Sequence, residues 1–319
     1  MRKFNLINIR NDRQFRAFTG LPDSLFNRLL SVFVQSLKLD EQRRDRNRHT
    51  PRRRQRGGGR KGALPTPELK LFFLLFYLKT YPTFDVLGCL FDLSPSKAEE
   101  QIQKLLPILK QAEKQLEVLP DRHFKPASKE VQPTEKTQKI TVDATERPLC
   151  RPQHARKQKN YYSGKSHRHT LKNTIVSNIN QGVQGIQAVG PTTPGRQHDY
   201  ASFKKEFNPE QPGLSSVMVW VDAGYQGIQK DYPQFKEIHI PHKKPRKSKF
   251  NPNPTLTPKQ KKENRAISRV RVGIENLIGD MKVFQILAIK FRNHIKSFAD
   301  QVILVIAGLC NLKNGYVVQ

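Results

Sequence analysis

Apolar and polar positions alternate differently in the two halves of the chain. Over 15–39 the apolar residues recur at helical spacing, and Gly20-Leu21-Pro22-Asp23 is a start signal, so an amphipathic helix is predicted there. Three further helices are predicted before residue 120, at 66–80, 84–91 and 94–116. The first half is therefore expected to be all-helical.

The last of these helices has two candidate caps, Ser94 and Ser96, and Ser96 with Glu99 fits a capping box. Three short helices joined by tight turns are typical of a helix-turn-helix. Glu99 and Glu100 would nevertheless repel phosphate at the start of the recognition helix. A plain packing module remains the alternative.

After residue 136 the pattern changes to short β-type runs separated by turn residues. Strands are predicted at 139–145, 170–178, 183–189, 217–221 and 237–240. Helices are predicted at 267–282 and 298–309. Strands mixed with helices indicate an α/β domain with a mixed sheet.

Two of the predicted strands carry an aspartate at the point where the strand is expected to end. Asp143 ends the strand of Lys139-Ile140-Thr141-Val142, and Asp222 follows an apolar run and precedes Ala-Gly-Tyr. Glu275 lies on the helix at 267–282, where Arg271 and Lys282 share its face. Taken singly, such aspartates often cap turns, and Arg271 with Glu275 could be an ordinary surface ion pair. The three acids together predict a site that holds a hard divalent cation.

Three other acids compete for this role. Glu146 lies three residues after Asp143, and Asp199 follows the third predicted strand. Asp280 lies five residues after Glu275 and therefore on another face of the helix. We expect Asp199 to serve a structural turn.

The net charge of the chain limits the classes of molecule that it is expected to bind. Lys and Arg number 57 against 27 Asp and Glu, a net charge of +30, which attracts polyanions, and nucleic acid is the natural one. The longest apolar runs, 71–78 and 302–307, are too short to span a bilayer. The first residues lack the features of a signal peptide, and three scattered cysteines argue against a disulfide framework. An intracellular, cytoplasmic protein is expected.

The excess of positive charge is concentrated in three stretches, at 43–61, 151–172 and 242–262. The first is expected to be a flexible arm, either a solvated linker or a phosphate contact through Arg52, Arg53 and Arg54. In the second, Lys165 and Lys172 are candidate DNA contacts. His167 and His169 in the same stretch could bind zinc in principle, but no third soft ligand is near.

Together these motifs resemble a known family. Asp143, the Asp-Ala-Gly-Tyr of 222–225 and the Arg-x3-Glu-x6-Lys of Arg271, Glu275 and Lys282 look like the acids of DDE transposases of the insertion-sequence-five and Harbinger-like group. Further segments that resemble this group are 56–61, 77–83, 161–165 and 169–172. One departure is Ser268, where related families place a tyrosine; we interpret it as variation within the group.

The resemblance implies a ribonuclease-H-like catalytic domain with an N-terminal helix-turn-helix-like domain. The expected division is an N-terminal helix and basic arm at 1–61, a helical domain at 62–120, a linker at 121–136 and the catalytic domain at 137–319. Asp143, Asp222 and Glu275 would hold Mg²⁺, with Mn²⁺ as a substitute, for a two-metal reaction on DNA phosphodiesters. Arg271 and Lys282 would either orient the DNA backbone or act as salt partners of the acids.

The implied partners are double-stranded DNA, both transposon ends and target, and further copies of the chain in a dimer or larger synapse. The implied location is the cytoplasm of a prokaryotic cell, at the nucleoid. Two alternatives remain: a catalytically silent DNA-binding repressor, which should have lost one of the three acids, and a stand-alone metal-dependent nuclease.

Overall fold

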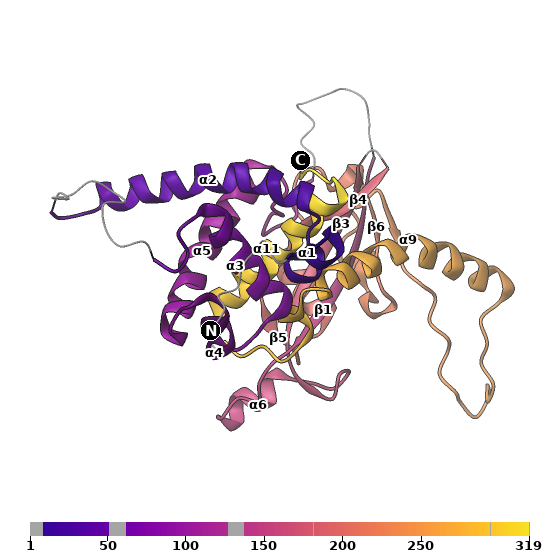
Figure 1. The fold of residues 1–319 in the computed structure, drawn as a ribbon. Coiled ribbons are helices and arrows are strands. Elements are labelled where there is room, and N and C mark those ends of the chain that lie inside the picture. Colours follow the sequence, from indigo (N-terminus) through magenta and orange to yellow (C-terminus); the bar gives the residue numbers. More distant parts are fainter. Residues whose placement is uncertain (1–8, 51–61, 127–136, 181, 294, 319) are drawn as a thin grey trace. The chain divides into compact units, whose positions relative to one another are not determined.

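The computed structural model describes residues 9–50, 62–126, 137–180, 182–293 and 295–318, which form two compact units. The described residues up to Leu119 and Met281–Val317 make a helical unit, and Pro120–Asp280 make a unit built on a β-sheet (Figure 1). The expected division assigned 281–317 to the catalytic domain. In the structure these residues pack with the N-terminal helices.

Seven helices make up the described part of the helical unit. They are α1 (Asp12–Thr19), α2 (Asp23–Arg46), α3 (Pro67–Thr80), α4 (Phe84–Phe91), α5 (Pro95–Gln115), α10 (Gln285–Ala288) and α11 (Lys296–Asn314). The predicted start signal is confirmed, because α2 begins at Asp23. Gly20 separates it from α1 with φ of 79°, a conformation that favours glycine. The extension of α2 to Arg46 corrects the expected arm, whose first residues are helical.

The core of this unit is centred on α3, where all residues from Leu71 to Leu78 are buried. A stretch buried on every side shows no amphipathic stripe, as expected of a central helix. The C-terminal α11 packs on α5, and Asn311 Nδ2 donates to Val118 O at 2.9 Å. Among the described residues, no helix is long and apolar enough to cross a membrane.

A tight turn joins α4 to α5. Leu93 N donates to Gly88 O at 2.9 Å, and a Cβ at Gly88 would lie 2.5 Å from Leu93 O, so the turn requires glycine there. Ser94 caps α5 by accepting from Lys97 N. The capping box predicted from Ser96 and Glu99 is therefore wrong.

The second unit is built on a seven-stranded mixed sheet. Its strands are β1 (Gln138–Pro148), β2 (Tyr162–Ser163), β3 (Arg168–Asn180), β4 (Val183–Val189), β5 (Thr193–Pro194), β6 (Val217–Trp220) and β7 (Glu237–His239). The path is β2-β3-β1-β6-β7, with β4 and β5 also paired to β3. β3 runs antiparallel to β1, whereas β1, β6 and β7 are parallel. This confirms the predicted mixed sheet, with β1 at its centre.

The two faces of the sheet differ in chemistry. One face is apolar: Ile140 and Val142 of β1 and Val219 of β6 join a core with Phe203 of α7 (Asp199–Glu206) and Ile228 of α8 (Ile228–Asp231). The next residues along each strand point to the opposite face.

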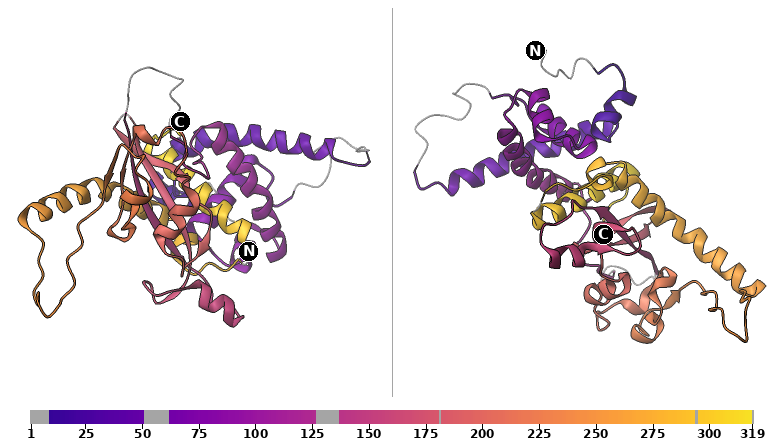
Figure 2. Two further views of the ribbon diagram at one scale, coloured as in Figure 1. Left: turned by 180° about the vertical axis from the view of Figure 1, so that it is seen from behind. Right: turned by 90° about the horizontal axis from the view of Figure 1, so that it is seen from below.

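On that opposite face lies the long helix α9 (Pro258–Lys282), whose later turns lie beside the sheet while its first turns project beyond it in Figure 2. It contacts the sheet closely, since a Cβ at Gly273 would collide with the Gln184 side chain of β4. The helix begins nine residues earlier than predicted, so the end of the basic stretch at 242–262 is helical.

Candidate active site

The central strand places Asp143 on the polar face of the sheet. Val142 belongs to the apolar core, so the alternation of a strand turns Asp143 toward the side of α9. Its carboxylate is 23% exposed, and Oδ1 accepts from the Ala144 backbone N at 2.8 Å. The residue is held between two neighbouring strands and is partly withdrawn from water.

The parallel pairing of β1 with β6 brings the second acid alongside. Thr141 pairs with Trp220, and Asp143 and Asp222 each lie two residues beyond that pair. Neighbouring strands are about 5 Å apart, so the register puts the two carboxylates side by side. Directly after Asp222 the chain turns into a short 3-10 helix, η3 (Ala223–Tyr225).

Helix α9 adds the third acid together with its arginine. Arg271 Nη2 lies 3.5 Å from Asp143 Oδ2 and 3.8 Å from Glu275 Oε1, and Nη1 lies 3.5 Å from Asp222 Oδ1. The guanidinium is only 12% exposed, whereas Glu275 is 54% exposed. The structure thus gathers the three predicted acids around one largely covered cation, and Arg271 is more than the surface partner of Glu275.

The charges of the three carboxylates and Arg271 together favour binding of a further cation among them. Burial raises the pKa of Asp143, and the neighbouring carboxylate of Asp222 raises it further. The Ala144 hydrogen bond, Arg271 and Lys165 oppose that rise without cancelling it. Three carboxylates share one guanidinium, so a net negative charge remains.

The structure places the residues predicted to contact DNA in different surroundings. Lys165 is exposed in the turn before β3 and is near enough to lower the pKa of Asp143. Lys282 is the last residue of α9 and falls in the helical unit. Arg52, Arg53 and Arg54 lie outside the described residues. For these residues DNA contact stays a prediction.

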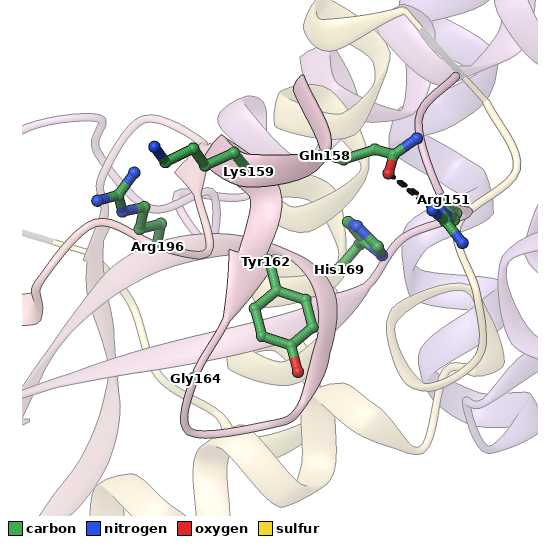
Figure 3. Close-up of a pocket in the computed structure, with 7 residues that line it drawn as sticks. All are labelled: Arg151, Gln158, Lys159, Tyr162, Gly164, His169 and Arg196. Carbon is green, nitrogen blue, oxygen red and sulfur yellow. Dashed lines mark hydrogen bonds between the residues drawn. The ribbon is translucent and has the colours of Figure 1, made fainter. Parts of the chain in front are cut away.

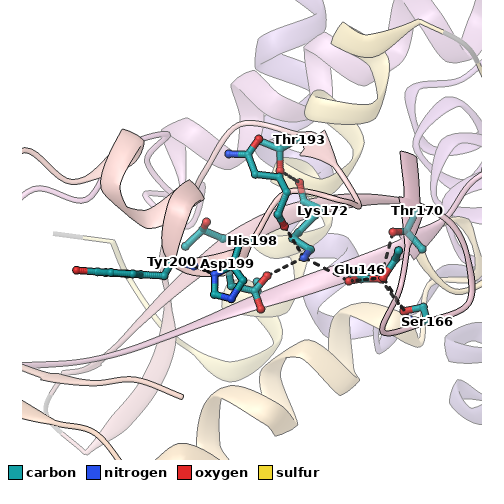
Figure 4. Close-up of polar contacts among 12 residues, drawn as sticks. Glu146, Ser166, Thr170, Lys172, Thr193, His198, Asp199 and Tyr200 are labelled. Carbon is teal, nitrogen blue, oxygen red and sulfur yellow. Dashed lines mark hydrogen bonds and ion pairs between the residues drawn. The ribbon is translucent and has the colours of Figure 1, made fainter. Parts of the chain in front are cut away.

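Lys172 is buried in an ion-pair network (Figure 4). Its Nζ lies 2.7 Å from Asp199 Oδ1 and 3.4 Å from Glu146 Oε1, and it donates to Gln197 O at 2.8 Å. With its ammonium so occupied, Lys172 is not presented to DNA, and we do not retain it as a contact. Glu146 and Asp199, the rival acids, are its partners.

The acid cluster fits a hard cation chemically. All of its side-chain donors are carboxylate oxygens, the ligands that Mg²⁺ and Mn²⁺ prefer. As the side chains stand around Arg271, the described residues contain no group of three His, Cys, Asp or Glu that could itself hold a metal ion. His169, one of the two histidines considered as a zinc ligand, lies opposite Tyr162 in the pairing of β2 with β3, and their ring centroids are 5.7 Å apart.

Comparison with protein families assigns a family to the part of the chain that carries the sheet and the three acids. The model of the DDE superfamily endonuclease matches residues 142–311, more than half of the chain, and spans all three acids. The chain belongs to the DDE superfamily endonucleases. Members of this superfamily generally use divalent metals, in agreement with the oxygen donors gathered here.

A second family model, the helix-turn-helix of DDE superfamily endonuclease, matches residues 62–114. It covers α3, α4 and most of α5, so the predicted helix-turn-helix is confirmed and the plain packing module is not. The Glu100 carboxylate that argued against it is paired with Lys97 at 2.7 Å, which lowers the pKa of Glu100.

One curated relative aligns along nearly the whole endonuclease chain. It is the probable transposase for insertion sequence element IS702 of Microchaete diplosiphon, 29% identical over 301 residues, or 94% of each chain. No solved structure matches the chain.

Sequence reasoning missed some features of this endonuclease. It did not find the network around Lys172, nor the stacking of Trp220 on His239, whose ring centroids are 4.3 Å apart. Both depend on partners from other elements of the fold. The only local signal was the density of polar residues between β1 and β3.

Proposed function

We propose that this endonuclease is a transposase of the insertion-sequence-five and Harbinger-like group. It binds the ends of its element, cleaves DNA strands there and joins the freed ends to target DNA. The observation that carries the proposal is the convergence of Asp143, Asp222 and Glu275 on Arg271. The name of the 29% identical relative, a probable transposase, supports the choice of reaction.

In this proposal Asp143, Asp222 and Glu275 hold Mg²⁺, or Mn²⁺ in its place, as a two-metal centre. When bound, the metal ions activate the attacking oxygen and stabilise the leaving oxygen of a phosphodiester. Asp143 is fixed by the central strand, whereas the exposed Glu275 is freer to adjust on α9. Arg271 compensates the charge of the carboxylates before loading and is then available to a DNA phosphate.

Both proposed steps are in-line displacements at phosphorus, with water as the nucleophile in cleavage and a 3′-hydroxyl in joining. The same three carboxylates therefore suffice for the two reactions. The element ends would be recognised by the helix-turn-helix of α3 to α5, and the basic stretches would track phosphates.

Bringing two element ends together requires at least two copies of the chain, so we propose a dimer or larger synapse on DNA. In a prokaryotic cell that assembly would act at the nucleoid. Light scattering of the chain with and without end DNA measures the stoichiometry, and a single chain on paired ends would contradict this part.

The decisive experiment is strand nicking and joining on a duplex that carries the element's own ends, with Mg²⁺. We compare the native chain with Asp143→Asn, Asp222→Asn and Glu275→Gln, which keep the shape of each side chain. Glu210→Gln, an exposed acid of the same unit, is the matched control. Cleavage and joining by the native and control chains, lost in the three variants that still bind DNA, would establish the site.

Other results separate the alternatives. Equal DNA binding without cleavage by any of the chains would favour a silent repressor. Cleavage that is never followed by joining would favour a stand-alone nuclease.

A further inference from the structure

An open surface hollow of about 720 Å³, called the cavity below, lies mainly along the segment that links β1 to β3 (Figure 3). The segment contains helix α6 (Ala155–Tyr161) and strand β2, which pairs with the start of β3. The residues that line the cavity are Arg151, Gln158, Lys159, Tyr162, Gly164, His169 and Arg196. This volume is in the range of pockets that take small organic molecules.

The lining is cationic. Arg151, Lys159 and Arg196 contribute positive charge, no acid lines the cavity, and none of the three forms an ion pair with a described acidic residue. Gln158 Oε1 accepts from Arg151 Nε at 3.1 Å and from Nη2 at 2.9 Å, which fixes the guanidinium without neutralising it. A guanidinium held in this way is suited to a phosphate group.

The cavity also offers aromatic surface. Tyr162 and His169 are directly paired across β2 and β3, with their rings inclined by 75°. Tyr162 remains 44% exposed, although it is a large side chain within a paired strand. An exposed ring near a fixed guanidinium matches the two halves of a nucleotide, since a base stacks on an aromatic face and a phosphate binds arginine.

Hydrogen bonds to Glu146, part of the network in Figure 4, connect the segment that forms the cavity to strand β1. Ser163, Ser166 and Thr170, all from the segment around the turn, donate to the carboxylate of Glu146, three residues after Asp143. Leu149 N donates to His169 O at 2.8 Å, which continues the attachment. The six residue steps from Asp143 to Leu149 span about 20 Å, or roughly six nucleotide steps of B-form DNA.

We infer that this cavity binds a single unpaired nucleotide of the DNA substrate, with its base against Tyr162 and its two flanking phosphates at Arg151 and Arg196, which lie on opposite sides of that ring in Figure 3. The inference rests on the proposed function for the nature of the ligand. A base inside a duplex cannot enter such a cavity, so the nucleotide must be flipped or must come from a frayed or single-stranded end.

The test uses binding alone, without Mg²⁺, on the full chain. The probes are a fluorescein-labelled single-stranded oligonucleotide and a blunt duplex of equal length. Tyr162→Ala should weaken binding of the single strand by about fivefold to a hundredfold, as expected for loss of one stacked base, and leave the duplex almost unchanged. Tyr162→Phe keeps the ring and should bind as the native chain does.

A charge-matched pair tests the phosphate half. Arg196→Gln should weaken single-strand binding more than duplex binding, whereas Arg168→Gln should affect both probes alike. Arg168 is exposed on β3 next to His169 but does not line the cavity. Equal losses on single strand and duplex for Tyr162→Ala would overturn the inference, because they would indicate phosphate contact only. No loss on either probe would overturn it as well.

A second measurement does not depend on folding of the variants. The native chain should quench the fluorescence of 2-aminopurine placed at an unpaired terminal position, and should not quench the same base inside a blunt duplex. Absence of quenching overturns the inference. Quenching by a chain that never cleaves would instead refute the proposed function alone, so the two failures are distinguishable.

Discussion

Glu206, the last residue of α7, is the part-buried acid whose ionisation should most affect the stability of the sheet unit. Its Oε1 accepts from Thr174 Oγ1 of β3 at 3.0 Å. The carboxylate fills the space beside Gly190, where a Cβ would collide with it. Burial raises the pKa of Glu206 from 4.5 to about 7, and the Thr174 hydrogen bond and the charge of Arg122 only partly oppose this.

The direction of the effect follows from the raised pKa. The folded state holds the proton more tightly than the unfolded state, so the contribution to stability is complete below pH 4.5 and is lost as the pH rises through about 7. At 1.36 kcal/mol for each pKa unit, the total is about 3 kcal/mol. Between pH 5 and pH 8 the native chain should therefore lose about 2–3 kcal/mol through this group.

Glu206→Gln removes the ionisation and keeps an oxygen that can accept from Thr174. The variant should lie within about 1 kcal/mol of the native chain at pH 5 and exceed its unfolding free energy by about 3 kcal/mol at pH 8. Urea titrations measure this, with a shift of about 1 M in the midpoint for a slope near 2 kcal/mol/M. The single tryptophan, Trp220 in β6, reports from the same unit.

Glu210→Gln, at an exposed position, is the control and should show no pH-dependent difference from the native chain. If the difference between Glu206→Gln and the native chain were the same at pH 5 and pH 8, the carboxyl group would not titrate between them. The account of its burial would then be refuted.

Three other predictions concern charge and close packing. Lys172→Met should lower the unfolding free energy by about 3–5 kcal/mol, because Glu146 and Asp199 lose their shared ammonium; a loss below about 1 kcal/mol in urea titrations would contradict this. Arg271→Gln should lower the melting temperature in a chelator, since the clustered carboxylates lose their cation, and Mg²⁺ should raise it more than in the native chain; calorimetry that shows equal Mg²⁺ shifts would count against the site. Gly88→Ala should destabilise the helix-turn-helix by about 1–3 kcal/mol through collision at the turn, and unchanged helical circular dichroism on heating would exclude that collision.

The sequence predicted the strands well because each carries its own local signal. β6 is an apolar run that ends shortly before Asp222, as predicted. The break predicted directly after Asp143 is wrong, because β1 continues to Pro148 through its pairing with β3, and Asp143 lies within the strand. Helix ends were harder to predict. α2 continues to Arg46 and α9 begins at Pro258 through basic, polar residues that propagate a helix without any apolar periodicity.

The candidate site was predictable only in part for a related reason. Asp143, Asp222 and Glu275 have recognisable local surroundings, whereas the role of Arg271 depends on the register between β1 and β6 and on the placement of α9. Lys172 looked like any other cation in a basic stretch. Its partners lie 26 and 27 residues away along the chain, and no local pattern indicates them.

The position of Arg271 gives the cluster a stable arrangement before any metal binds. Two aspartates on adjacent parallel strands repel each other, and burial of Asp143 makes that repulsion stronger. A guanidinium four residues before Glu275 reaches all three carboxylates from one turn of α9, at 3.5 to 3.8 Å. These separations are long for arginine–carboxylate hydrogen bonds, so the cation shields the acids without binding them tightly. A hard divalent ion would meet carboxylates that are already gathered, and Arg271 would need only a small movement to meet the phosphate that follows.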